Sequence, residues 1–125
     1  MATIKSYSDL EQSKKLAEIL PIESADMYYF LDPTPAGNIY HIVTPQIDFG
    51  VKTKEPEYNK GDIPCWSLAA LLDVLPNDTS LLYFDNAYQM VYDKKPYVIL
   101  NKFDNPIDSC VAMVIKLSEL NLLRL

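Results

Sequence analysis

The fold of this chain is decided by residues 63–76, IPCWSLAALLDVLP. Eleven residues lie between the two prolines, and Asp73 is the only charged one among them. Pro64 suits the first position of a helix, because its missing N–H would find no partner inside the helix. A helix that is apolar on nearly all sides must be enclosed by other elements. We therefore predict a buried central helix that begins at Pro64, with Trp66 as a core anchor.

A second helix is predicted near the C-terminus, where the local signal is the strongest in the chain. Asn105 can cap the helix, Pro106 fits its first position, and Asp108 places a negative charge at the positive end of the helix dipole. The helix should extend to about Asn121. Its apolar face is predicted to comprise Ile107, Cys110, Val111, Val114, Leu117 and Leu120 or Asn121.

A third helix is predicted near the N-terminus. Ser8 and Glu11 have the spacing of a capping box, in which the serine hydroxyl and the glutamate carboxylate satisfy backbone N–H groups of the first turn. Leucine, isoleucine and alanine then recur at helical spacing up to Pro21, which ends the segment. This helix should pack against the rest of the domain by one face.

Runs rich in aromatic and β-branched residues predict the strands. The turn at residues 32–38 should join the first two into an antiparallel hairpin, and residues 52–62 should form a solvated loop. The last three runs favour a β-meander, although the first two of them could instead be one strand with a bulge. The predicted runs are 27–31, 39–43, 46–51, 81–84, 88–92 and 97 to 102 or 103. Residues 46–51 could be either a half-buried strand or an extended edge segment.

Together these elements predict one α+β domain over residues 1–125. An antiparallel sheet of four to six strands should be covered on one face by the central and C-terminal helices, with the N-terminal helix at the side. A chain of 125 residues with 49% hydrophobic and 22% charged residues is typical of a globular domain with one core.

The charge distribution argues against direct binding of nucleic acid or of a membrane. The net charge is −6, Arg124 is the only arginine, and no basic cluster exceeds two lysines.

No apolar run approaches the roughly 20 residues that a membrane span needs. Residues 1–15 lack the apolar core of a secretory signal, so the protein is predicted to be cytoplasmic. Cys65 and Cys110 are accordingly predicted to be reduced core thiols.

The residues that carry most enzyme chemistry are scarce. His41 is the only histidine, the two cysteines are far apart, and the three glycines are too widely spaced to hold a phosphate. Ser67 and Ser109 have no base near them in the sequence. We therefore predict no metal site, no cofactor and no catalytic activity. A small hydrolase that uses His41 and nearby carboxylates remains as an alternative.

Tyrosine is abundant, with nine residues in the chain. Tyrosines in strands could line an exposed sheet face and contact another protein with little loss of rotamer entropy. The expected function is therefore that of a protein-interaction module, and a second copy of the chain is one candidate partner. A further alternative is an acidic effector that imitates nucleic acid and inhibits a host enzyme. The candidate contact residues are Tyr28, Tyr40, Tyr88, Tyr92 and Tyr97.

Two segments, residues 63–72 and 105–122, resemble those of small uncharacterised proteins encoded in prophages and mobile elements of gut bacteria. The resemblance covers about the C-terminal half of the chain. It implies an intracellular accessory protein, and it assigns no role to any single residue, because no activity is assigned to that group.

Overall fold

The structure of this protein is a computed structural model that describes residues 5–44, 46–48, 51–54 and 60–123. The chain has α+β architecture, as predicted, with three α-helices and antiparallel strands. The helices are α1 (Leu10–Ala17), α2 (Leu68–Val74) and α3 (Pro106–Glu119), with a short 3-10 helix η1 (Ile22–Ser24). The strands are β1 (Met27–Thr34), β2 (Gly37–Val43), β3 (Gln46–Asp48), β4 (Val51–Lys54), β5 (Ile63–Cys65), β6 (Thr79–Phe84), β7 (Ala87–Tyr92) and β8 (Val98–Ile99).

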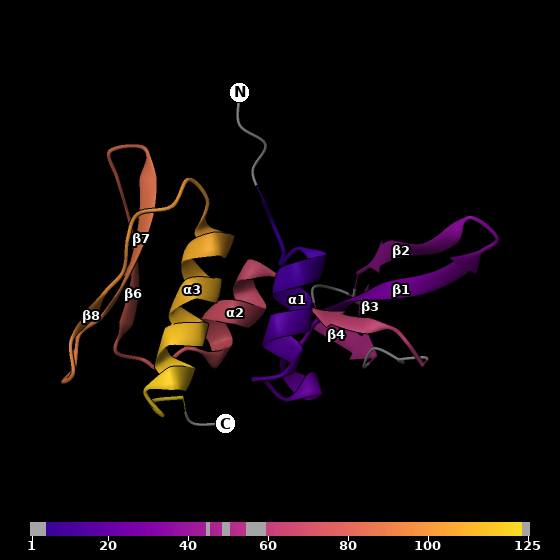
Figure 1. Ribbon diagram of the computed structural model, residues 1–125. Coiled ribbons are helices and arrows are strands. Elements are labelled where there is room, and N and C mark those ends of the chain that lie inside the picture. The colour runs from indigo at the N-terminus through magenta and orange to yellow at the C-terminus, as the bar shows by residue number, and fades with distance from the viewer. Residues whose placement is uncertain (1–4, 45, 49–50, 55–59, 124–125) are drawn as a thin grey trace.

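The strands form two separate three-stranded sheets, ordered β2-β1-β5 and β6-β7-β8, and a two-stranded pair β3-β4. Figure 1 shows the three helices between the two larger sheets. The prediction of a single sheet of four to six strands was therefore wrong. The physical reason is that the two sheets contact different helices: α1 packs on β5 of the first sheet, whereas α3 packs on β7 of the second. The chain crosses from one sheet to the other through α2.

The segment predicted to start the central helix is instead a strand. β5 pairs with residues 27–29 of β1 and is an edge strand of that sheet. Proline is tolerated in an edge strand, because its missing N–H is not needed for pairing with a further strand. The helix begins only after Ser67, whose hydroxyl accepts a hydrogen bond from the backbone N–H of Ala70 at 3.2 Å. The start predicted at Pro64 was therefore wrong.

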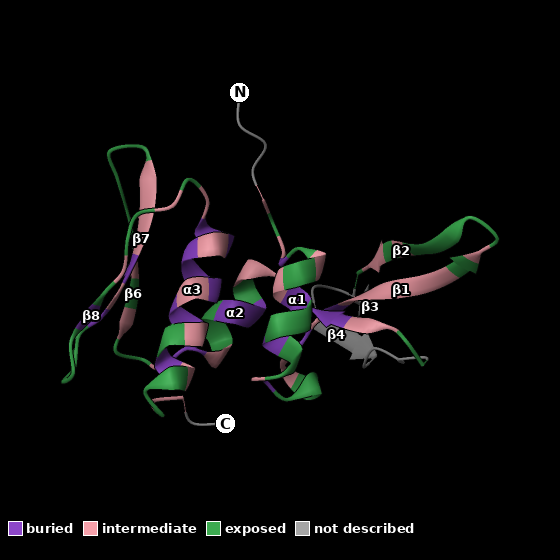
Figure 2. Cartoon of the chain, viewed as in Figure 1, coloured by how far each residue is buried: buried purple, intermediate pink, exposed green. Residues whose placement is uncertain are grey.

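The central helix α2 is also less enclosed than its apolar sequence predicts, and Figure 2 shows both buried and exposed residues along it. Leu71 is fully buried, but Leu72 is 43% exposed, and Ala69 and Asp73 also face solvent. A helix of two turns that packs one face on α3 leaves its opposite face open. The prediction for Trp66 is confirmed, because it is fully buried and its indole N–H donates to Ser24 Oγ at 2.9 Å.

The C-terminal helix starts as predicted and ends at Glu119, close to the predicted end. The prediction that Leu120 or Asn121 continues its apolar face was wrong, because both lie beyond the helix and are exposed, whereas Met113 is buried. Asn105 caps α3 by accepting from the Asp108 N–H at 2.8 Å, and Pro106 occupies the first turn. The helix lies in the middle of the fold, between α2 and the β6-β7-β8 sheet (Figure 1). Its core face comprises Ile107, Cys110, Val111, Met113, Val114 and Leu117, all at most 4% exposed. Both cysteines are free and buried, as predicted.

The N-terminal helix is capped one residue later than predicted. Asp9 and Gln12, rather than Ser8 and Glu11, form the capping box. Ser8 is instead fully buried, where its hydroxyl accepts from the Trp66 N–H at 3.1 Å and contacts Ser13 Oγ at 2.7 Å. The serine is therefore used to fix the N-terminal segment against β5, and the exposed aspartate takes over the cap.

Both predicted hairpins are present. β1 and β2 pair from Tyr28–Val43 to Thr34–Gly37, so the strands extend further into the turn than predicted. In the meander, β6 and β7 are two strands joined at Asp85 and Asn86, whose φ angles of 53° and 58° are those of a tight hairpin turn. The alternative of one bulged strand was therefore wrong.

The last predicted strand is shorter than expected, and the start of the predicted loop 52–62 is a strand. The last strand of the meander is reduced to β8, with a separate bridge between Tyr88 and Phe103. Within the predicted loop 52–62, residues up to Lys54 belong to strand β4, which pairs with β3. The predicted strand 46–51 thus divides between β3 and the start of β4. Residues 55–59 of the predicted loop lie outside the described residues.

Candidate interaction surface

The β6-β7-β8 sheet has one face in the core and one face open. Side chains alternate between the faces of a strand, and directly paired residues share a face. Met90, Tyr92 and Val98 point toward α3 and α2 and are at most 7% exposed. The opposite side, which we call the outer face, comprises Ser80, Leu82, Phe84, Ala87, Gln89, Val91 and Ile99 by register.

Apolar side chains dominate the outer face and remain open to solvent. Leu82 is 41%, Phe84 40% and Ile99 72% exposed. In Figure 1 the helices lie on one side of this sheet only. A contiguous exposed apolar surface on a monomer commonly marks a contact site for another protein. Lys102 crosses this face, with its ammonium 4.2 Å from the Phe84 ring centroid and 3.5 Å from Asp85.

The five tyrosines predicted to form a contact surface do not share one sheet. Tyr28 and Tyr40 lie on the first sheet, and the register of β1 with β2 places them on opposite faces. Tyr88 and Tyr92 lie on the core side of β7, and Tyr92 is only 7% exposed. Tyr97, just before β8, is 64% exposed. The expectation that several of them line one exposed face is therefore corrected.

The residues of the outer face were not predicted, because the predicted contact residues were chosen among the tyrosines of the strands. A signal was present in residues 79–84, TSLLYF, which continue apolar on both faces from residue 81. An antiparallel strand with one wet face normally alternates apolar and polar residues. Residues 81–84 depart from this alternation, which distinguishes β6 from an ordinary half-exposed strand.

His41 lies beside a carboxylate, as the hydrolase alternative requires, but in an open position. Its Nε2 is 3.2 Å from Asp32 Oδ2 across the β1–β2 pair, and the imidazole stacks on Phe30. The side chains of His41 and Asp32 are 56% and 46% exposed. Among the described residues no cluster of three histidine, cysteine or acidic side chains could hold a metal ion. This arrangement is a pair of neighbouring polar side chains on an exposed hairpin.

Two buried serines and one of the two thiols form a polar cluster in the interior. Ser8, Ser13 and Cys65 are fully buried together, and Tyr29 donates to the Ser8 carbonyl at 2.7 Å. Burial raises the pKa of Cys65, although hydrogen bonds with Ser8 and Ser13 oppose this. Burial also raises the pKa of Cys110 to about 12. Both thiols therefore stay protonated near pH 7 and lack the thiolate that nucleophilic chemistry needs.

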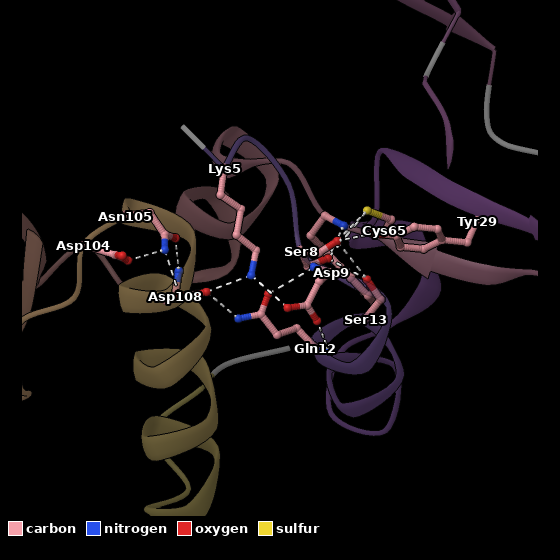
Figure 3. A network of polar contacts seen from close by, with 11 residues as sticks. Lys5, Ser8, Asp9, Gln12, Ser13, Tyr29, Cys65, Asp104, Asn105 and Asp108 are labelled. Carbon is pink, nitrogen blue, oxygen red and sulfur yellow. Dashed lines mark hydrogen bonds and ion pairs between the residues drawn. The ribbon is translucent and has the colours of Figure 1, made fainter. Parts of the chain in front are cut away.

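A polar network joins the N-terminal segment, α1 and α3 (Figure 3). The Asp108 carboxylate accepts from Lys5 Nζ at 2.8 Å, from Gln12 Nε2 at 2.7 Å and from Asn105 Nδ2 at 2.8 Å. Lys5 also contacts Asp9 at 2.9 Å. Burial disfavours the charged carboxylate, but the three hydrogen bonds outweigh it and lower the pKa of Asp108. The network fixes the start of α3 against α1.

Asp108→Asn should reduce the free energy of unfolding by about 1–2 kcal/mol at pH 7, because hydrogen bonds to a charged group are lost. The folded-state pKa of Asp108 is lowered, so its contribution is complete above the unfolded value of about 3.9 and is lost as the pH falls through the folded value. Urea unfolding from pH 7 to pH 2 should therefore show the two proteins converging below about pH 4. Asp93→Asn, an exposed control, should match wild type throughout, and a gap for Asp108→Asn that persists at pH 2 would contradict the assignment.

Several acidic residues pair with a nearby lysine. Asp9 and Asp108 pair with Lys5, whereas Asp78 and Asp85 each lie 3.5 Å from a lysine at opposite ends of β6. Asp26 accepts from the Ser67 N–H at the start of α2. These pairs belong to different elements. They provide no support for the row of free carboxylates that an imitation of nucleic acid requires.

A cavity of about 320 Å³ lies where α2 ends. It is lined by the α2–β6 turn, the end of β7 and Leu122. Three charged residues line it: Asp73, Asp78 and Lys94. Asp78 and Lys94 lie 3.5 Å apart and pair with each other.

A scan against protein-family models and searches of curated proteins and of solved structures found no match to this chain. The resemblance to proteins of prophages and mobile elements thus stays a prediction. Among the described residues, no helix is long and apolar enough to cross a membrane.

Proposed function

We propose that this chain is a non-catalytic, cytoplasmic protein-interaction protein that binds a partner protein through the outer face of its β6-β7-β8 sheet. The observation that carries the proposal is the exposure of Leu82, Phe84 and Ile99 on the face opposite α3. Interface centres are enriched in aromatic side chains and depleted in charge. On this face Phe84 follows Leu82 on β6, and the Lys102 ammonium lies 4.2 Å from the Phe84 ring centroid.

The chemistry of the interior supports the non-catalytic part of the proposal. The two thiols are buried with raised pKa values, and the one histidine is exposed on a hairpin. Free cysteines agree with a reducing compartment such as the cytoplasm. An accessory role in a mobile element, as the sequence resemblance implies, is compatible with a small protein that acts by contact.

Ile99→Glu should abolish partner binding without unfolding the protein. Ile99 is 72% exposed on the outer face, so a carboxylate there remains hydrated in the free protein but would be desolvated in a complex. Ile39→Glu is the matched control, since Ile39 is also a strand isoleucine, 49% exposed, but on β2. We expect a stoichiometric companion to be captured from the lysate of the source organism by wild type and Ile39→Glu. The amount of this companion that Ile99→Glu captures should be at least tenfold lower than for wild type.

Two results would contradict the proposal. If Ile99→Glu retained the companion and Ile39→Glu lost it, the contact surface would be the β1–β2 hairpin. If His41→Ala removed an enzymatic activity found in a substrate screen while Ile99→Glu did not, the hydrolase alternative would replace the proposal.

A further inference from the structure

Strand β6 is an open edge of its sheet, with β7 as its only neighbour in the described sheet. The Asp93 N–H donates to the Asp78 carbonyl at 2.9 Å, next to the end of this strand pair. Hydrogen-bonded and non-hydrogen-bonded pairs alternate along an antiparallel ladder. The even-numbered residues of β6 therefore bond to β7. The backbone N–H and C=O groups of Leu81 and Tyr83 point the other way, toward the open edge.

This edge lacks the usual protection against pairing. Natural edge strands are kept from pairing by charged residues, prolines or short length. β5 has Pro64 and β8 spans only two residues. β6 has six residues without any charge or proline. An exposed edge of this kind can accept another strand by backbone hydrogen bonding.

Charge is balanced at both ends of the same strand. Lys94 Nζ lies 3.5 Å from Asp78 at one end, and Lys102 Nζ lies 3.5 Å from Asp85 at the other. The whole chain carries a net charge of −6, yet this edge presents one positive and one negative group at each end. Two such edges in antiparallel orientation would bring neutral ends together, without the repulsion that the net charge would otherwise cause.

We propose that a second copy of this chain pairs with β6 in antiparallel orientation about a two-fold axis at Leu82. Leu82 then faces Leu82 of the second copy, and Leu81 and Tyr83 exchange backbone hydrogen bonds across the axis. In this register Asp78 faces Asn86 and Asp85 faces Thr79, so no two aspartates are directly opposed. The two-fold axis is perpendicular to the sheet, which keeps the outer faces of both copies on one side.

The pairing joins two three-stranded sheets into one continuous sheet with a doubled outer face. That the doubled outer face binds a partner protein rests on the proposed function. The dimer itself does not depend on that function. Multi-angle light scattering should give about twice the chain mass of 14.2 kDa at micromolar concentration.

Substitutions at Tyr83 test the backbone pairing. Tyr83→Pro removes the N–H that points to the open edge, and proline is tolerated at such positions of an edge strand. The dissociation constant of the dimer should rise at least tenfold for Tyr83→Pro, so this variant should be monomeric at the same concentration. Tyr83→Ala is the matched control, because it removes the 62% exposed side chain and keeps the N–H, so it should remain dimeric. Dimeric Tyr83→Pro with a native circular dichroism spectrum would overturn the proposal.

A charge swap at Leu82 tests the register and remains decisive if Tyr83→Pro fails to fold. Leu82→Glu and Leu82→Lys should each be monomeric, because like charges would face each other at the axis. Their equimolar mixture should recover the dimer mass. A wild-type mass of 14.2 kDa, or a mixture that stays monomeric, would overturn the dimer. The capture experiment with Ile99→Glu decides the proposed function independently of that result.

Discussion

Trp66→Ala should lower the free energy of unfolding by about 3–5 kcal/mol, the range for removing a large buried aromatic side chain. Trp66 is fully buried in the hydrophobic cluster that α2, α3 and β7 share. Its backbone also pairs with Ser8, so the residue links the N-terminal segment, β5 and α2. Small domains have a total stability of about 5–15 kcal/mol, so this loss could remove much of the folded population. Urea unfolding followed by circular dichroism would measure it.

Two control variants distinguish the stability lost by emptying a buried site from the stability lost by removing any aromatic side chain. Trp66→Phe keeps most of the apolar volume but leaves Ser24 Oγ without its indole donor at 2.9 Å, so an intermediate loss is expected. Tyr97→Ala removes an aromatic side chain that is 64% exposed and should change stability by less than about 0.5 kcal/mol. A loss below about 1 kcal/mol for Trp66→Ala would show that this side chain is not in the core.

The elements that the sequence predicted correctly are those whose signals are local. α3 begins with an Asx cap, a proline and an acidic residue, and each of these acts on the backbone within one turn. The β6–β7 turn likewise depends on Asp85 and Asn86, whose side chains tolerate positive φ angles. Such signals need no knowledge of distant parts of the chain, so they could be interpreted before the structure was known.

The start of the central helix was predicted incorrectly because Pro64 is compatible with two structures. Proline fits both the first turn of a helix and the edge of a sheet. The choice is made by residues 27–29 of β1, which pair with β5 and are more than 30 positions away. Sequence periodicity also says nothing about which hairpins share a sheet. The division into two sheets depends on which helix each strand packs against.

The residues of the outer face could not be predicted from composition. The tyrosines divide between two sheets, and Tyr92 belongs to the core. The outer face depends on the register that places Leu82 and Ile99 on the side away from α3. A shift of one residue would exchange the two faces of a strand. The register is set by the hairpin turn and by the fit of Met90 against α3, where Cys110 Sγ lies 4.0 Å from Met90 Sδ.

The central claim is that one face of the β6-β7-β8 sheet belongs to the core and the other is open to solvent. Its most direct test is urea unfolding of Val98→Glu and Ile99→Glu, which place the same charge on neighbouring residues. Val98 is 7% exposed, so an unpaired carboxylate there should cost about 3–5 kcal/mol or prevent folding. Ile99→Glu should change the free energy of unfolding by less than about 1 kcal/mol. Equal losses for the two variants, or a larger loss for Ile99→Glu, would contradict the claim.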